Sequence, residues 1–417
     1  MRLSLSLVVA CWCLSPVLSF AENWTTYRGP QENGHTTAKN LPNEWSEQQN
    51  IAWKVPIRGR GWSSPVIWGN ELWLTTASPD GKELWAICLD RQSGKTLFEE
   101  KLVDVAKPQY AHPYNSYASP TPCMEEGRIY LHWGSPATIC LDTKTRKPIW
   151  TRTDLKCDHF RGAGSSPVIA GDLLILTFDG FDFQYVMALD KNTGKDVWRA
   201  NRTYHDPKGN GDYKKAYSTP KVIDVAGKKL VVSPSAAYTC AYELETGKEV
   251  WKVKHGGMNA ASLPIFEHGL LYTTSADGGD QLVAVKPDGT GDVTKSHVAW
   301  KSNKGIPNRS SLLPLGDYLF MVNSGRIATC MEAKTGKVLN TARLEGSSSK
   351  FVASPILSEG KIYVFDEDGM SFVFKADESL EVLGKNKLAD GVMASPAAVD
   401  NSLYVRTKSH MYCIQKK

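Results

Sequence analysis

Short apolar runs, separated by turns rich in Gly, Asp and Asn, follow one another along most of the chain. In residues 165–199, the runs SSPVIAG, LLILTF and QYVMALD each have the length and composition of a β-strand, and the turn KNTGK leads into a fourth run, DVWRA. Glycine in such a turn accepts the positive φ that a tight hairpin requires. The pattern predicts an antiparallel sheet of four strands as the structural unit.

This unit recurs roughly every 40 to 55 residues. Each copy opens with two small residues, usually followed by proline. We count eight openings, at residues 63–65, 118–120, 165–167, 218–220, 261–263, 310–312, 353–355 and 394–396. Repeated four-stranded units of this length are typical of propeller blades rather than solenoid coils. The sequence therefore predicts an all-β fold, an eight-bladed β-propeller with four-stranded antiparallel blades; seven blades is the alternative if one unit is an insertion.

The two ends of the chain support a closed ring. The eighth unit has three predicted strands, ASPAAV, SLYVRT and HMYCIQ, and lacks a fourth. Residues 50–57 (NIAWKVPI) form an isolated strand pattern with Trp53 at the position of a fourth strand. Borrowing this strand would close the ring and remove its open edges. We expect an N-terminal extended segment at residues 22–49 and the propeller at residues 50–417.

The first residues have the features of an export signal. Arg2 precedes a nearly continuous apolar stretch at residues 3–18, and small residues stand at Ser19 and Ala21. We predict a signal peptide at residues 1–21, cut after Ala21, and a periplasmic or secreted protein. An uncleaved anchor helix and a lipoprotein modified at Cys11 are the alternatives. No later stretch is long and apolar enough for a transmembrane segment in the mature chain.

Composition and charge limit the kinds of partner that we expect. Apolar residues make up 41% of the chain and charged residues 22%, which suits a protein with a large core. The formal net charge of +5 is spread along the sequence, whereas a nucleic-acid-binding protein would cluster Lys and Arg on one face. We therefore expect no nucleic acid among the partners.

Several cysteines occupy one repeat position. Cys88, Cys140, Cys330 and Cys413 stand near the end of the third strand, where the third unit has Ala188. A position that alternates between Cys and Ala holds a small buried residue. Equivalent strands of different blades lie too far apart for a disulfide, so we predict free thiols at these four positions. The repeat leaves Cys123, Cys157 and Cys240 undecided.

The repeat resembles that of a known superfamily. The unit Ala/Cys-x-Asp-x-x-Thr-Gly-x-x-x-Trp recurs in register, with Trp150, Trp198, Trp251 and Trp300 after successive turns and Phe98 in the first unit. It is similar to the tryptophan-docking repeat of pyrroloquinoline-quinone (PQQ) propellers. The leader at residues 23–45 (NWTTYRGP, then LPNEW) also looks like the start of exported PQQ-like repeat proteins. The resemblance implies that each Trp packs between neighbouring blades and that Gly forms the tight turn beneath it.

This superfamily includes both enzymes and binding proteins. The resemblance to its quinoprotein alcohol dehydrogenases implies a vicinal Cys-Cys disulfide, a Glu/Asn/Asp set for Ca²⁺ and an Asp base. The sequence has no adjacent cysteines, and no acidic cluster of the kind Ca²⁺ requires precedes the blade openings. It also lacks G-x-S-x-G, H-E-x-x-H and Cys-x-x-Cys motifs. We assign no catalytic and no metal-binding residue and expect no PQQ or Ca²⁺, as in the non-catalytic BamB-like members; a PQQ-dependent oxidoreductase is the alternative.

The loops that enter the first strand of each blade line one mouth of the channel. Five of these loops carry a cation, and aromatic or amide side chains fill the remaining positions. The candidate ligand-binding residues are Arg60, Trp62, Tyr114, Asn115, His159, Arg161, Lys215, Asn259, Asn308, Arg309 and Lys350. A ring of cations around a concave mouth favours an anionic ligand. We predict binding of an unknown protein, a peptide or an anionic glycan; ordinary polar surface loops are the alternative.

Two further features of these loops allow different interpretations. Trp62 is a candidate stacking platform, unlike the blade tryptophans. His112, His159 and His255 precede blade openings, and we expect them to be solvated loop residues. A metal-binding or proton-transfer role for these histidines is the alternative.

Overall fold

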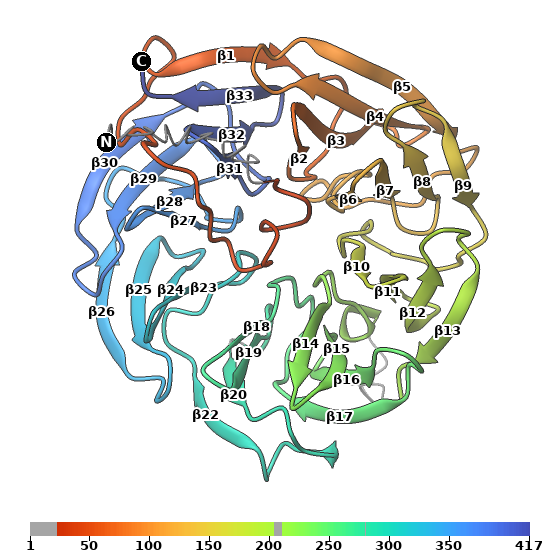
Figure 1. Cartoon of the computed structure of the whole chain (residues 1–417). Helices are drawn as coiled ribbons and strands as arrows, with labels where there is room; N and C mark the ends of the chain where they lie inside the picture. Colours follow the sequence, from red (N-terminus) through yellow and green to blue (C-terminus); the bar gives the residue numbers. More distant parts are fainter. Residues whose placement is uncertain (1–22, 204–210, 280) are drawn as a thin grey trace, which may run out of the picture.

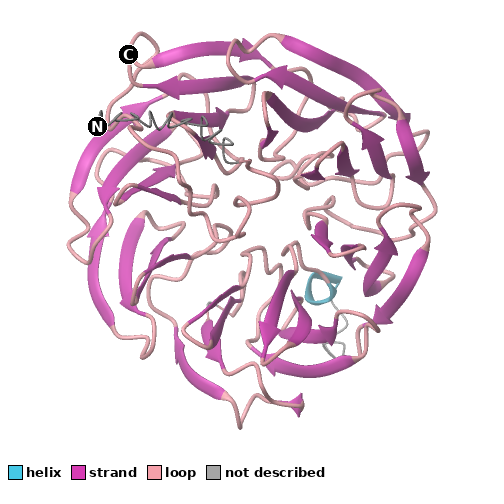
Figure 2. Ribbon diagram, in the orientation of Figure 1, coloured by secondary structure: helices cyan, strands magenta, loops and turns pink. Residues whose placement is uncertain are grey.

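The computed structural model describes residues 23–203, 211–279 and 281–417. Within these residues, eight sheets stand around a central axis, and the chain passes through them in order (Figure 1). Strands and loops make up nearly all of the fold, with one short helical turn, η1 (Gly211–Lys214) (Figure 2). The prediction of an eight-bladed propeller with four-stranded antiparallel blades is confirmed.

Each blade runs outward from its innermost strand. The first four blades are β2(Val66–Trp68), β3(Glu71–Ala77), β4(Glu83–Asp90) and β5(Thr96–Asp104); β6(Cys123–Glu125), β7(Arg128–His132), β8(Thr138–Asp142) and β9(Pro148–Arg152); β10(Val168–Ala170), β11(Leu173–Asp179), β12(Gln184–Asp190) and β13(Asp196–Asn201); and β14(Lys221–Val225), β15(Lys228–Pro234), β16(Tyr238–Glu243) and β17(Glu249–Lys254). A two-residue strand, β21(Gly291–Asp292), extends the fourth blade by pairing in parallel with β17.

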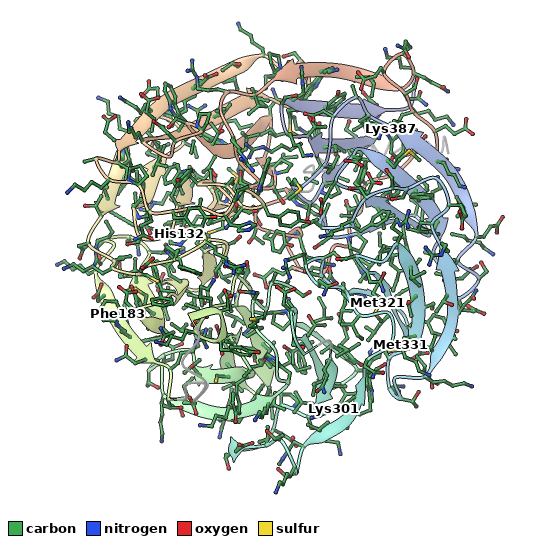
Figure 3. The ribbon with its side chains drawn as sticks, turned by 180° about the vertical axis from the view of Figure 1, so that it is seen from behind. His132, Phe183, Lys301, Met321, Met331 and Lys387 are labelled. Carbon is green, nitrogen blue, oxygen red and sulfur yellow. The ribbon has the colours of Figure 1, made fainter. Side chains whose placement is uncertain are left out.

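The second half of the ring follows the same plan. Its blades are β18(Ile265–Glu267), β19(Leu270–Thr274), β20(Leu282–Val285) and β22(Val298–Ser302); β23(Leu313–Leu315), β24(Tyr318–Val322), β25(Ile327–Glu332) and β26(Val338–Arg343); β27(Ile356–Ser358), β28(Lys361–Phe365), β29(Met370–Lys375) and β30(Val382–Lys387); and β31(Ala397–Val399), β32(Ser402–Arg406) and β33(His410–Gln415) with β1(Ile51–Pro56). Side chains fill the space between blades, as the view from behind shows (Figure 3).

The last blade takes its outer strand from the start of the propeller. Strand β1 pairs antiparallel with β33, and Trp53 lies opposite Cys413. Figure 1 shows the red β1 beside the blue β33, next to the end of the chain. The predicted ring closure is therefore confirmed, and the missing fourth strand of the eighth unit is accounted for.

Tryptophans of the outer strands lock neighbouring blades together. The indole N–H of Trp198 in the third blade donates to the backbone oxygen of Leu244 in the fourth, at 2.8 Å. The ring lies on the turn glycine of that blade, so close that a Cβ on Gly247 would stand 2.4 Å from it. Equivalent contacts join Trp53 to Gly94, Trp150 to Gly194 and Trp300 to Gly336. Glycine is required at this turn position for two reasons: its φ is positive, and the indole leaves no room for a side chain.

The first junction replaces this Trp–Gly contact with a different pair. Phe98 stands at the Trp position of the first blade, and Arg146 stands at the glycine position of the second, with φ +62°. The Arg146 guanidinium lies 6.0 Å from the Phe98 ring and 4.8 Å from the Trp73 ring, and it pairs with Glu71. At this junction Phe98 replaces the tryptophan and Arg146 replaces the glycine. Cation–π contacts of Arg146 therefore connect the two blades in place of the Trp–Gly contact.

A ring of hydroxyl groups encircles the axis where the innermost strands begin. In seven of the eight steps, a backbone N–H donates to the Ser or Thr hydroxyl of the next blade, at 2.8 to 3.0 Å; the acceptors are Thr121, Ser166, Thr219, Ser311, Ser354, Ser395 and Ser64. The fifth blade has Leu263 at this position, and there the Ser218 hydroxyl donates to the Ser262 carbonyl instead, at 2.6 Å.

This ring corrects two of the predicted openings. The repeat position falls on residues 120–122 in the second blade and on residues 262–264 in the fifth. The predicted openings at 118–120 and 261–263 were therefore two residues and one residue too early. The sequence Ser119-Pro120-Thr121-Pro122 offers two small-residue–proline pairs, and only the second precedes the strand.

Residues 23–49, which we call the plug, cross the axis at the end of the channel opposite the entering loops (Figure 1). The Trp24 N–H donates to Ile67 O at 2.9 Å in the first blade, and the Lys39 N–H donates to Asp400 O at 2.6 Å in the eighth. Glu32 pairs with Lys221 of the fourth blade at 3.2 Å. Because the plug bonds to blades around the ring, it closes this end of the channel.

All seven cysteines of the described residues are buried free thiols. This confirms the prediction for Cys88, Cys140, Cys330 and Cys413, and it settles Cys123, Cys157 and Cys240. Cys11 and the predicted signal peptide lie outside the described residues. In the part of the chain that the structure describes, no helix is long and apolar enough to cross a membrane.

Candidate functional site

The open mouth of the channel leads into a cavity of about 410 Å³. Its walls come from the loops that enter the innermost strands, and they carry seven of the candidate residues: Trp62, Tyr114, Asn115, Arg161, Asn259, Arg309 and Lys350. Members of the hydroxyl ring, including Thr121 and Ser166, line it more deeply, and Tyr27 of the plug also contributes. The Tyr27 hydroxyl is hydrogen-bonded to that of Ser354 at 3.0 Å. The plug thus contributes one side chain to the wall of the cavity.

Two of the cavity cations are paired with carboxylates. Arg161 contacts Asp212 at 2.9 Å, and Arg309 contacts Asp277 at 2.9 Å. The guanidinium of Arg309 and the amide of Asn259 hold the pKa of Asp277 below its usual range, although burial opposes them. The sequence analysis took neither Asp212 nor Asp277 into account, so it overstated the positive charge of the mouth.

Two further loop cations, Lys350 and Arg60, lie against aromatic rings. The Lys350 ammonium is 5.5 Å from the centre of the Tyr114 ring, and the Arg60 guanidinium is 5.1 Å from that of Trp62. Arg60 also donates to the backbone oxygen of Pro113. No carboxylate of the described residues forms an ion pair with either cation. These two charges remain available to an anion that enters the mouth.

Four candidate residues lie outside the cavity wall. Lys215 is fully buried, where its ammonium contacts Asp212 at 2.9 Å and faces the Phe160 ring at 4.5 Å. His159 is also buried, and its Nε2 accepts from the Ser135 N–H at 2.9 Å. Asn308 does not line the cavity, and Arg60 lines a second pocket beside it. The buried side chains of Lys215 and His159 therefore support the loops of the cavity wall but do not line the cavity.

The loop histidines are not equivalent. His112 lines the cavity, whereas His159 and His255 are buried, against our expectation of solvated side chains. Burial lowers the pKa of each buried imidazole to about 4. His132, labelled in Figure 3, is also buried, and burial lowers its pKa to about 3. All three are neutral at pH 7, which fits packing rather than proton transfer.

A second pocket of about 460 Å³ adjoins the cavity. Trp62, Tyr114 and Met393 line both spaces, and Arg60, Lys408 and Glu367 line the outer one. Burial raises the pKa of Glu367 to about 7, with Lys408 opposing the shift. Oε1 of this carboxyl group is buried without a hydrogen-bond partner among the described residues.

Among the described residues, neither the cavity nor the outer pocket offers the cluster of carboxylates that a Ca²⁺ ion requires. Ca²⁺ takes six to eight oxygen ligands, several of them carboxylates. The described residues contain no group of three or more His, Cys, Asp or Glu side chains placed to hold a metal ion. At the cavity itself, Asp277 is already bonded to Arg309 and Asn259.

Sequence reasoning missed four residues that shape this region: Tyr27, Asp212, Asp277 and Glu367. Asp212 lies three residues before the candidate residue Lys215, and Asp277 lies in the loop that follows β19. The loops after second strands meet the entering loops at the mouth, as the paired Met258 and Asp277 show. A search of those loops for carboxylates would have found Asp277. No repeat signal points to Tyr27.

Comparisons with known proteins place the chain among propellers of two kinds. A family model described as outer membrane protein assembly factor BamB matches residues 182–417. BamB of Shewanella oneidensis is 25% identical over 258 residues, which are 60% of this chain and 58% of that protein. A quinohemoprotein alcohol dehydrogenase of Comamonas testosteroni is 29% identical over 140 residues, 32% of this chain and 19% of the enzyme. The chain thus spans little more than half the length of the BamB relative.

Solved structures agree on the fold. BamB from Moraxella catarrhalis has a TM-score of 0.63 at 16% identity, covering 88% of this chain and 97% of that one. The Comamonas testosteroni enzyme has a TM-score of 0.67 at 12% identity, covering 95% and 81%. At such low identity, these likenesses establish the propeller architecture, and the mouth must be interpreted from its own residues.

Proposed function

Because the chain belongs to the family described as outer membrane protein assembly factor BamB, we propose that it is a periplasmic, non-catalytic propeller that binds an anionic ligand or the acidic part of a protein at its channel mouth. The observation that carries this proposal is the cavity in which Arg161, Arg309 and Lys350 share a wall with aromatic side chains. Convergent polar groups in a concave site are typical of a binding site.

The charge arrangement favours a ligand of modest negative charge. Asp212 and Asp277 offset Arg161 and Arg309, and they fix both guanidinium groups in place. A preorganised guanidinium loses little side-chain freedom when it binds a carboxylate. Lys350 and Arg60 supply the charge that is not offset. We expect binding that weakens as salt rises, because exposed charges are screened.

A matched pair of double variants tests the proposal. The probes are heparin-derived oligosaccharides, trigalacturonate and an acidic Glu/Asp peptide, measured by calorimetry on the mature chain. Arg161→Ala/Arg309→Ala should weaken the bound probe by at least about tenfold, since each lost charged hydrogen bond contributes about 1.5–3 kcal/mol. Arg199→Ala/Arg343→Ala removes two exposed arginines of outer strands and should leave affinity unchanged. Equal affinities in both variants, or no binding of any probe, would refute the proposal.

A PQQ-dependent oxidoreductase is the second candidate, favoured by the similarity to the Comamonas testosteroni enzyme. Incubation of the mature chain with PQQ and Ca²⁺ tests it. We expect no bound chromophore and no reduction of an electron-accepting dye. Reproducible turnover with an alcohol would replace the binding proposal with this one.

A further inference from the structure

Asn259 lines the cavity and carries a buried hydrogen-bond acceptor. The residue is 3% exposed and lines the wall beside Arg309. Its Nδ2 donates to Asp277 Oδ2 at 3.0 Å. A carboxylate only accepts hydrogen bonds, so this contact fixes which end of the amide carries oxygen. Asn259 Oδ1 has no hydrogen-bond partner among the residues that the structure describes.

Asp277 holds the acceptor beside a donor. Its Oδ2 accepts from both Asn259 and Arg309, the latter at 2.9 Å. The amide and the guanidinium are thereby locked next to each other on one carboxylate. The Asn259 backbone adopts φ +56°, a conformation that Asn tolerates better than most residues. An acceptor and a charged donor side by side suit a ligand that offers both a hydroxyl group and a carboxylate.

The outer pocket also contains a carboxyl oxygen without a hydrogen-bond donor in the described chain. Glu367 Oε1 is another buried oxygen without a hydrogen-bond partner among the described residues, and Lys408 and Arg60 line the same pocket. Trp62 and Tyr114 stand between the two spaces and line both. An aromatic face flanked by acceptors and cations on each side suits a chain of polar rings better than a compact anion.

We propose that the ligand of this cavity is an acidic oligosaccharide, a chain of uronic acid units, which donates sugar hydroxyls to Asn259 in the cavity and to Glu367 in the outer pocket. This inference rests on the proposed function, since the carboxylates of the sugar use the same cations. A sulfate or a hydroxyl-free carboxylate has no proton to donate to Asn259 Oδ1. Burying an acceptor without a partner costs about 1–3 kcal/mol, so selectivity for a hydroxylated acid follows.

Calorimetry with three probes of related chemistry tests the ligand class. Trigalacturonate carries three carboxylates and many hydroxyls, propane-1,2,3-tricarboxylate carries three carboxylates and no hydroxyl, and maltotriose carries hydroxyls and no charge. We expect trigalacturonate to bind at least about tenfold more tightly than the tricarboxylate, and maltotriose to bind still more weakly. Equal affinity for the two anions would overturn the inference while the proposed function stands. If neither anion binds, the proposed function fails as well.

Two variants then assign the acceptors. Asn259→Gly removes the amide at a positive φ that glycine accepts, and it should weaken trigalacturonate about five- to tenfold while changing tricarboxylate affinity less than twofold. A purely structural role would weaken both probes alike and would overturn the assignment. Asn40→Gly is the matched control, an exposed Asn with φ +59° outside the cavity.

Ligands of different length test whether the outer pocket takes part in binding. Glu367→Leu should weaken trigalacturonate but leave galacturonic acid, a single ring, unchanged. Loss of affinity for both, or for neither, would remove Glu367 from the site. An acidic peptide, triglutamate, is the competing class: if it binds more tightly than trigalacturonate, the ligand is a peptide and the glycan assignment is wrong.

Discussion

The outer rim and the mouth of this propeller are built by opposite rules. At the rim, the same contact recurs: Trp53, Trp150, Trp198 and Trp300 each dock on a turn glycine of the next blade. At the mouth, the eight entering loops share no side-chain pattern, and the polar groups of the wall are held by individual contacts such as Arg309 with Asp277. The repeated contact closes the ring, whereas the differences between the loops make the mouth asymmetric.

This difference predicts where substitutions act. Each rim tryptophan is part of a blade-to-blade interface, so its loss should reduce stability and leave the cavity chemistry intact. The mouth side chains lie on loops that a rigid ring supports, so their loss should change binding with little effect on stability.

Trp198→Ala should produce the largest loss of stability. The indole is 8% exposed, and its N–H donates to Leu244 O at 2.8 Å. Truncation leaves a cavity over Gly247 and a carbonyl without its donor, so the free energy of unfolding should fall by about 3–5 kcal/mol. Denaturant unfolding measures this change. The neighbouring Val197→Ala is the control: its side chain is 48% exposed, and it should cost less than about 0.5 kcal/mol.

Acid should destabilise the ring through its buried histidines. Burial lowers the pKa of His132 to about 3 and those of His159 and His255 to about 4. The unfolded chain binds protons near pH 6.5 and the folded chain does not, so the stabilisation is complete above pH 6.5 and is lost as pH falls toward 4. Each histidine contributes on the order of 3 kcal/mol to this change.

The melting temperature between pH 7.5 and 4 measures this effect. We expect it to fall steeply below pH 6.5, and His255→Gln to make the fall shallower, whatever it does to stability at pH 7. An unchanged slope in the variant would show that His255 is protonated in the folded state. Such a result would mean that His255 can take part in proton transfer and does not serve packing alone.

The same division explains how much of the fold could be predicted. Eight blades, the strand borrowed by the last blade and the docking of Trp198 all follow from repetition, which a single sequence displays. The second opening was misplaced because Pro120 and Pro122 both follow small residues, and only packing selects one of them. The plug has no periodic pattern, and its position depends on contacts with distant blades.

The mouth was predicted less completely for a related reason. The loops were identified because each precedes a recognisable strand, and seven candidate residues line the cavity. Their pairing was not predictable, because Asp277 reaches Arg309 from a loop of another kind in the neighbouring blade. Lys215 and His159 illustrate the remaining difficulty: a polar residue in an entering loop can face the cavity or support the wall from behind.

The inner hydroxyl ring should be intermediate between rim and mouth, since it repeats like the rim but borders the cavity. Ser311 accepts from the Leu263 N–H at 2.9 Å, and both residues are buried. Ser311→Ala leaves that N–H without a partner, so unfolding free energy should fall by about 1–3 kcal/mol. Leu263→Ser would place a hydroxyl where the ring lacks one and should cost less than Leu263→Ala. If Ser311→Ala lowers the free energy of unfolding by less than about 0.5 kcal/mol, the hydroxyl ring does not stabilise the fold.

The smallest expected effect has the opposite sign and comes from the mouth. Burial raises the pKa of Glu367 to about 7, so the folded chain holds a proton that the unfolded chain releases near pH 4.5. Stability therefore declines as pH rises from 4.5 through 7, and Glu367→Gln should remove this decline. At pH 8 the variant should be more stable by about 1 kcal/mol, a figure reduced for the partial exposure of the carboxyl group, and at pH 4 the two proteins should be equal. Thermal unfolding at both pH values measures the difference. A variant that is less stable at pH 8 would place Glu367 among the structural residues, whereas a stabilised one would show that the mouth retains a buried carboxylate at a cost to folding, as sites of binding often do.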